Sequence, residues 1–186
     1  MLDRINSRAL ESSKPQAFET MANQIYHSLE SDIQPLEMSN SLTGVIIEVI
    51  ALATSTLATT DSERKLAVWL ASCDQSQFGS GMVGFDVCKL PWSKEGLEDE
   101  RSFLLRAIDA AQKKLGWEKL DFEPNPAHVS ERLLQLQELI AAVESDHIQK
   151  GYGGPGDHPP EGFPRCSVDG VYLHVMGCVV CNARGV

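Results

Sequence analysis

The sequence predicts a mainly α-helical protein, an irregular bundle of about five helices with a small zinc-binding β-hairpin or knuckle at the C-terminus. Apolar residues recur every three or four positions along most of the first 150 residues, as on the buried face of a helix. Over residues 151–164 this pattern gives way to glycine, proline and charge, and three of the five cysteines follow. We therefore expect a helical domain over residues 1–150, a linker over residues 151–164 and a zinc-binding tail over residues 165–186.

The first two helices are predicted from apolar spacing. Apolar side chains at intervals of three and four predict a helix over residues 17–33, which Pro35 ends. A second apolar stripe predicts a helix over residues 42–57 with Ser39 as its N-cap. The β-branched residues within 45–50 leave a strand as the alternative for that part, although we favour the helix.

Three further helices have recognisable starts. Thr60 and Glu63 have the spacing of a capping box, in which each side chain bonds a backbone amide of the other residue. Ser93 is the expected cap of a helix that Gly116 ends. Asn125 precedes a proline, a combination of cap and first-turn residue that predicts the fifth helix.

The charge of the chain points to a basic partner. Sixteen Lys and Arg residues against 26 Asp and Glu residues give a formal net charge of −10, which makes nucleic acid an unlikely partner and a basic protein the suspected one. No Lys or Arg occurs between Pro15 and Glu63, so we expect a negative solvent-facing side on the first two helices. A solvated acidic face without a partner is the equally weighted alternative. The candidate partner-binding residues are Glu30, Asp32, Glu37 and Trp92. For Trp92 a place in the core is the simpler interpretation, and exposure for a partner is the alternative.

Nothing in the sequence predicts export or a membrane anchor. The first eight residues lack the apolar core of a signal peptide. The most apolar run, residues 44–53, is too short to cross a bilayer and contains Glu48. An odd number of cysteines in such a chain favours metal binding over disulfides. We expect a cytoplasmic protein that makes no contact with a membrane.

The strongest chemical signal lies in the tail. Cys178 and Cys181 have the C-x2-C spacing that lets two thiolates face one metal ion, and Cys166 and His174 lie within reach in the sequence. These four residues form a Cys3His set, which suits tetrahedral zinc; an iron–sulfur cluster is the weaker alternative. Asp169 is the second candidate for the fourth ligand. Four ligands from the chain would leave no open position, so we expect a structural ion.

Residues 166–181 carry a resemblance to a known kind of metal site. Cys-x-x-Asp-Gly-x-Tyr followed by Gly-Cys-x-x-Cys resembles the paired knuckles of a zinc ribbon or zinc knuckle. The chain departs from that pattern at Asp169, where a second Cys or His is usual. The resemblance implies a short hairpin that joins the two knuckles around one zinc ion.

A second resemblance concerns the helical body. The segments GFDVCKLPW, FLLRAID and GWEKLDFEP, residues 84–92, 103–109 and 116–124, resemble small acidic bacterial proteins that include immunity-type proteins. The leading hypothesis is therefore a non-enzymatic acidic binding protein with a structural zinc site, of the toxin-neutralising kind. A zinc-tail nucleic-acid or regulatory adaptor is the first alternative, and a zinc-dependent hydrolase with an open metal site is the second. No motif identifies a small-molecule substrate.

Overall fold

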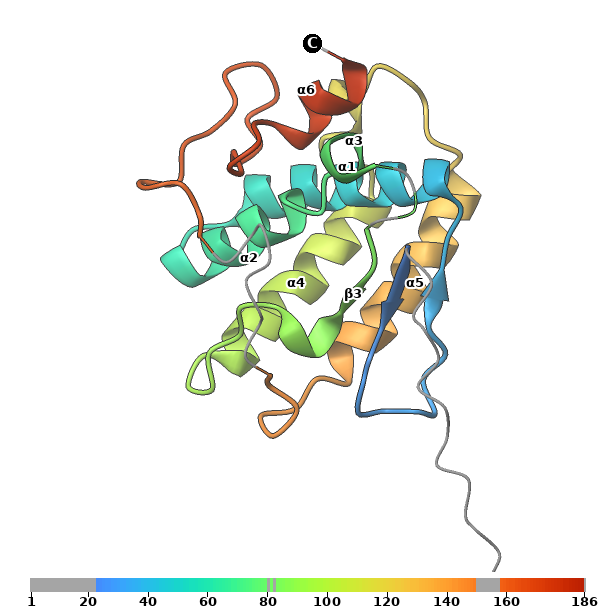
Figure 1. Cartoon of the computed structure of the whole chain (residues 1–186), viewed down its shortest axis with the longest axis vertical. Coiled ribbons are helices and arrows are strands. Elements are labelled where there is room, and N and C mark those ends of the chain that lie inside the picture. The colour runs from blue at the N-terminus through green and yellow to red at the C-terminus, as the bar shows by residue number, and fades with distance from the viewer. Residues whose placement is uncertain (1–22, 80, 82, 150–157, 186) are drawn as a thin grey trace, which may run out of the picture.

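The fold is mainly helical, as predicted. The computed structural model describes residues 23–79, 81, 83–149 and 158–185. Four long helices dominate them: α1 (Asn40–Leu57), α2 (Asp61–Ala71), α4 (Leu97–Gln112) and α5 (Pro126–Ala141). Two short helices, α3 (Gln75–Phe78) and α6 (Val179–Arg184), lie next to each other beside α1 (Figure 1). Residues 151–157 of the predicted linker, and residues 17–22 of the first predicted helix, lie outside the described residues.

Helix α1 lies at the centre of the molecule. Helices α4 and α5 cover one side of it, and the C-terminal segment crosses the opposite side (Figure 1). By length and composition α1 is apolar enough to cross a membrane, with a mean hydropathy of 1.4 over its 18 residues, but 61% of that window is buried inside the protein. The core helix of a globular protein meets the same criteria, and this is the place that α1 has here.

The predicted starts of α1, α2 and α5 are confirmed. The Ser39 hydroxyl accepts a hydrogen bond from the amide of Leu42. Asn125 accepts from two amides in the first turn of α5. Ser93 has a different role from the predicted cap: α4 begins at Leu97, and the Ser93 hydroxyl donates to the buried carboxylate of Glu100 at 2.8 Å.

The capping box of α2 is complete. Thr60 Oγ1 accepts from the amide of Glu63 at 3.3 Å, and Glu63 Oε2 accepts from the amides of Thr59 and Thr60 at 2.7 and 3.0 Å. Burial alone would raise the pKa of Glu63, but these hydrogen bonds outweigh it and lower that pKa. The box therefore ties the turn before α2 to its first turn.

We expect Thr60→Ala to lower the free energy of unfolding by about 1 kcal/mol, because the amide of Glu63 then loses its acceptor. Urea denaturation monitored by circular dichroism measures the change. Thr56→Ala is the matched control: it removes an exposed threonine inside α1, where alanine is the better helix former. Equal midpoints for the two variants would contradict the capping role.

The predicted helix over residues 17–33 is wrong in its described part. Strand β1 (Gln24–Tyr26) pairs antiparallel with β2 (Leu36–Glu37) and parallel with β3 (Phe85–Asp86). Asn23, just before β1, has a φ of 75°, which no α-helix contains. The third strand approaches so closely that a Cβ on Gly84 would lie 2.8 Å from the carbonyl oxygen of Gln24. Pairing partners some sixty residues away leave no trace in a local apolar spacing.

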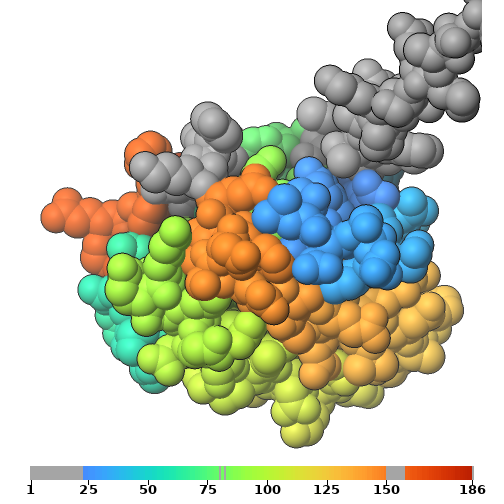
Figure 2. Space-filling model, turned by 90° about the horizontal axis from the view of Figure 1, so that it is seen from below, coloured from blue at the N-terminus to red at the C-terminus, as the bar shows by residue number. Residues whose placement is uncertain are grey.

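The loop between β1 and β2 rests on the chain that follows α5. Figure 2 shows the two segments side by side on one face. Gln149 donates from its side chain to Ser28 Oγ at 2.9 Å and from its amide to the carbonyl of Cys88 at 3.0 Å. The N-terminal sheet is thus fastened to the end of the helical bundle.

The C-terminal segment does not form the predicted hairpin of strands. In the described tail, two isolated antiparallel bridges, Arg165 with Tyr172 and His174 with Gly177, precede α6. The segment packs onto α1: the Tyr172 amide donates to Ser55 Oγ at 3.0 Å, and Arg165 donates to the Ser55 carbonyl at 2.7 Å. Tyr172 and Val180 belong to the same hydrophobic core as the long helices. The segment therefore pairs with itself only at single bridges, and its contacts with α1 and the shared core hold it on the helical body.

Candidate metal centre

Four side chains of the C-terminal segment converge on one point. They are Cys166, Asp169, Cys178 and Cys181, and their potential ligand atoms all lie within 4.8 Å of one another. Asp169 and Cys178 are buried, while Cys166 and Cys181 are half-buried. The three cysteines predicted as ligands are thus brought together. Their number and kind can hold a metal such as zinc.

Most of the known distances within this cluster are close to those of a tetrahedral zinc site. With zinc–sulfur bonds of about 2.3 Å, two sulfur atoms of a regular tetrahedron lie about 3.8 Å apart, and a sulfur and an oxygen about 3.5 Å apart. The Sγ atoms of Cys166 and Cys181 are separated by 3.7 Å. Asp169 Oδ2 lies 3.7, 3.6 and 3.0 Å from the sulfur atoms of Cys166, Cys178 and Cys181, respectively. Three of these four distances lie within about 0.2 Å of the tetrahedral values, and the distance between Asp169 and Cys181 is about 0.5 Å shorter, so the chain brings four donors close enough to share one metal ion such as zinc.

The carboxylate of Asp169 is oriented for this role. Its Oδ2 faces the three sulfur atoms, and its Oδ1 accepts an ion pair from Arg184 Nη2 at 3.1 Å. Lys119 Nζ donates to the Asp169 carbonyl at 2.8 Å. Such outer partners fix the direction of a metal ligand and balance the negative charge of thiolates. Sequence reasoning did not identify Arg184 or Lys119, because neither belongs to a local motif.

The local fold explains how the donors meet. The Gly170 amide donates to the Cys166 carbonyl at 3.0 Å and closes a tight turn, in which Gly170 takes a φ of +71° that side-chain-bearing residues rarely adopt. This turn brings Asp169 back over Cys166. Cys178 caps α6 and Cys181 lies in its first turn, so their side chains project from the same end of the helix.

The thiols have different protonation tendencies. Burial raises the pKa of the Cys178 thiol to about 11, and burial together with the adjacent Asp169 carboxylate raises the pKa of Cys181. For Cys166, burial acts in the same direction, but backbone amides of Asp169 and Val168 donate to the sulfur and lower its pKa overall. A divalent cation stabilises thiolates directly, so ion binding and loss of protons from these thiols are coupled.

His174, the predicted fourth ligand, lies outside this cluster, and Asp169 takes its place. The His174 ring is only 2% exposed, and its Nε2 lies 3.2 Å from Asp74 Oδ2. Its Nδ1 accepts from the Met176 amide, so the Nε2 proton is directed to Asp74. Asp74 Oδ2 also accepts from Asn182 Nδ2 at 2.7 Å. His174 therefore joins the tail to the start of α3, a contact that strand alternation did not predict.

One of the four residues predicted for partner binding is buried. Asp32 and Glu37 are exposed, and Glu30 is half-buried with its carboxylate 3.7 Å from His147 Nε2. Trp92, in contrast, is 8% exposed and donates its indole N–H to the Val87 carbonyl at 2.8 Å, so the alternative of an exposed Trp92 is wrong. A basic protein partner stays a prediction.

The expected negative side is also smaller than predicted. Glu48 and Glu63 lie in the segment without Lys or Arg for which a negative solvent-facing side is expected, but both are buried. The apolar residues on both sides of Glu48 could have predicted its burial, because a helix that is apolar all round lies in the core and takes its single charged residue with it.

Comparisons with protein-family models, with curated proteins and with solved structures give no significant match. The two resemblances expected from the sequence thus receive no support from known proteins. The metal centre and its surroundings have to be interpreted from the chain itself.

Proposed function

We propose that the protein is a non-enzymatic zinc-binding protein in which one ion, held by Cys166, Asp169, Cys178 and Cys181, fastens the C-terminal segment to the helical body. One observation carries the proposal: four potential ligand atoms from the chain lie within 4.8 Å of one another, and most of their known distances are close to those of a tetrahedral zinc site. Because four protein ligands complete the coordination of zinc, no position is left for a substrate or an activated water. The ion is therefore structural.

A second cysteine next to a histidine, Cys88 beside His27, is unsuited to covalent catalysis, and this supports a non-enzymatic role. Cys88 Sγ lies 3.6 Å from both ring nitrogens of His27, but Cys88 is fully buried. Burial, and then the adjacent Asp86, raise the pKa of Cys88 to about 11. His27 Nδ1 already accepts from the amides of Leu29 and Glu30. A nucleophilic cysteine needs a lowered pKa and access to substrate, and Cys88 has neither.

Metal analysis of the purified protein tests the proposal. We expect one zinc ion per chain, and we expect Asp169→Asn to weaken zinc binding at least about 100-fold in competition with a chelator, because a ligand and its charge are lost. His174→Gln is the matched control, since it changes the predicted ligand that the structure places outside the cluster, and it should keep the zinc. Loss of zinc in His174→Gln and its retention in Asp169→Asn would overturn the proposed ligand set.

A further inference from the structure

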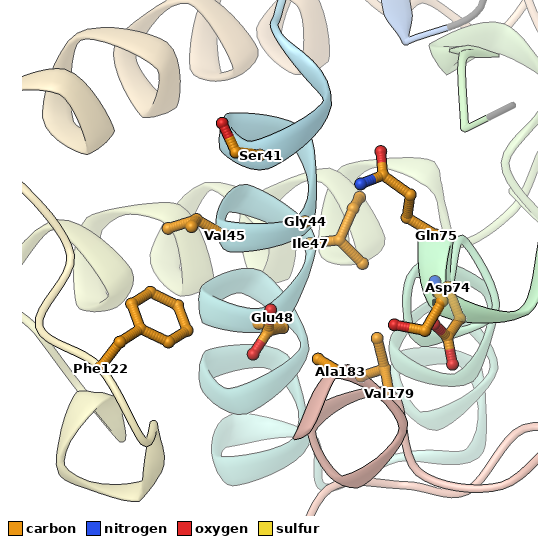
Figure 3. A pocket seen from close by; sticks show the side chains of 11 residues that line it. Ser41, Gly44, Val45, Ile47, Glu48, Asp74, Gln75, Phe122, Val179 and Ala183 are labelled. Atoms are coloured by element: carbon orange, nitrogen blue, oxygen red, sulfur yellow. Dashed lines mark hydrogen bonds between the residues drawn. The ribbon is translucent and has the colours of Figure 1, made fainter. Parts of the chain in front are cut away.

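A pocket lies beside the metal centre, on the face of α1 that the C-terminal segment only partly covers. It has a volume of about 360 Å³, within the usual range for small-ligand sites. Helix α1 forms the floor of the pocket. Residues at the start of α3 and on α6 line one side, and Phe122 lines the other side (Figure 3). Val179 and Ala183 are the residues that α6 contributes.

Two polar groups of this pocket have no hydrogen-bond partner within the described residues: the carboxylate of Glu48 and the buried side-chain oxygen of Gln75. Glu48 is 6% exposed, and within the described part of the chain neither a hydrogen bond nor an ion pair reaches its oxygens. Figure 3 shows the side chain standing on the pocket face of α1, between Phe122 and Asp74. A buried ionised carboxylate without a partner is costly, and a cationic donor removes that cost.

The neighbouring charged groups are already engaged. Asp74 accepts from His174, from Asn182 and from the Ser76 amide that it caps. Arg184, whose positive charge lowers the pKa of Glu48, is paired with Asp169. Burial raises the pKa of Glu48 to about 7, and the negative charges of Asp121, Asp74 and Asp169 act in the same direction. The negative charge of an ionised Glu48 is therefore not balanced by a cation of the described chain.

The shape and lining of the pocket favour an organic cation. A divalent metal ion takes six or more oxygen ligands or several thiolates and imidazoles, and Glu48 is not among the potential metal-binding groups of the described residues. Val45, Ile47 and Val179 are apolar, and the Phe122 ring offers a face that attracts an ammonium group. Gly44 leaves room above the carboxylate, because a Cβ there would lie 3.9 Å from Glu48 Oε1.

We propose that this pocket binds an alkylammonium group, with Glu48 as the counter-ion and the apolar walls around the alkyl chain. The inference rests on the proposed function in one respect: Val179 and Ala183 belong to α6, which the zinc ion holds in place. The group belongs either to a free amine or to a lysine side chain, because both carry the same cation on an apolar stem.

Isothermal titration calorimetry at pH 8 tests the inference on the full chain, after its zinc content has been measured. At this pH Glu48 is largely ionised and an alkylamine remains protonated, as lysine does. We expect hexylammonium to bind at least tenfold more tightly than 1-hexanol or hexanoate, which share its chain but not its charge. Equal binding of the three probes, or of none, would overturn the inference.

Two variants and one control locate the site. Glu48→Gln should weaken hexylammonium binding at least tenfold, while Glu37→Gln, which removes an exposed carboxylate elsewhere, should leave it unchanged. Gly44→Ala should weaken binding severalfold without loss of thermal stability, because its methyl group makes only ordinary contacts and alanine favours the helix. Equal effects of Glu48→Gln and Glu37→Gln would contradict the site.

One further comparison distinguishes a free amine from a lysine side chain as the ligand, and another distinguishes the alkylammonium site from the proposed zinc site. The capped peptide acetyl-Gly-Lys-Gly-amide presents a lysine side chain. Tighter binding of the peptide than of hexylammonium assigns the site to a protein partner, and the reverse assigns it to a free amine. A chain that contains no zinc but still binds hexylammonium through Glu48 would overturn the proposed function and leave this inference standing.

Discussion

Removal of zinc should release the C-terminal segment from the helical body before the body itself unfolds. With a chelator in excess, we expect the amides of residues 158–185 to lose their protection from hydrogen exchange, while those of α4 and α5 keep most of theirs. Without the ion, the raised pKa values of Cys178 and Cys181 keep these thiols protonated, so only weak S–H hydrogen bonds to Asp169 replace the metal bonds that fasten the segment. Hydrogen exchange followed by mass spectrometry measures both regions in one experiment.

The stability of the whole protein should fall with the segment. Structural zinc contributes about 10–16 kcal/mol to the folding of small zinc-binding peptides at neutral pH. Here the segment also buries Val171, Tyr172 and Val180 in the common core, and each such side chain contributes about 1.5–3 kcal/mol on burial. We therefore expect the free energy of unfolding to drop by several kcal/mol, which urea denaturation in the presence of chelator measures.

Cysteine variants separate the metal from other effects of the chelator. Cys181→Ser should reproduce the loss of protection without any chelator. Cys73→Ser is the matched control, because Cys73 is a half-buried free cysteine just after α2 and lies outside the cluster. If residues 158–185 exchange at the same rate with and without chelator, the ion does not hold the segment.

The sequence predicted best what depends on neighbouring residues. Ser39, Thr60 and Asn125 cap their helices as predicted, because a cap is a contact within one turn. The C-x2-C pair was equally local, and the end of α6 indeed presents both sulfur atoms to one point. These features could be identified without any knowledge of the tertiary structure.

The features that failed depend on distant parts of the chain. Residues 23–33 form a strand and a loop because Ile25 pairs with Leu36 and Phe85, and apolar spacing cannot distinguish that from a helix face. The choice between His174 and Asp169 depended on Asp74, which lies a hundred residues before His174 and binds its ring. The burial of Glu48 likewise depended on which face of α1 the tail covers.

Glu48→Gln should stabilise the protein, and increasingly so as the pH rises. The pKa of Glu48 is raised in the folded protein from 4.5 to about 7, chiefly by burial and then by Asp121 and Asp74, while Arg184 opposes them and Asp169 adds to them. Below about pH 4.5 Glu48 is protonated in both the folded and the unfolded chain, and it costs no folding stability. As the pH rises through about 7, the unfolded chain ionises Glu48 more readily than the folded protein does, so the free energy of unfolding falls. A shift of this size corresponds to up to about 3 kcal/mol.

We therefore expect the difference in unfolding free energy between Glu48→Gln and the natural chain to grow from near zero at pH 4 to about 3 kcal/mol at pH 8. Urea denaturation at intervals of one pH unit measures it, with Glu37→Gln as the exposed control whose difference should stay flat. Parallel curves for the natural chain and Glu48→Gln would show that the carboxylate is solvated. A protein that keeps a destabilising carboxylate in its core gains from a cationic ligand, so hexylammonium should raise the stability of the natural chain at pH 8 and leave Glu48→Gln unchanged.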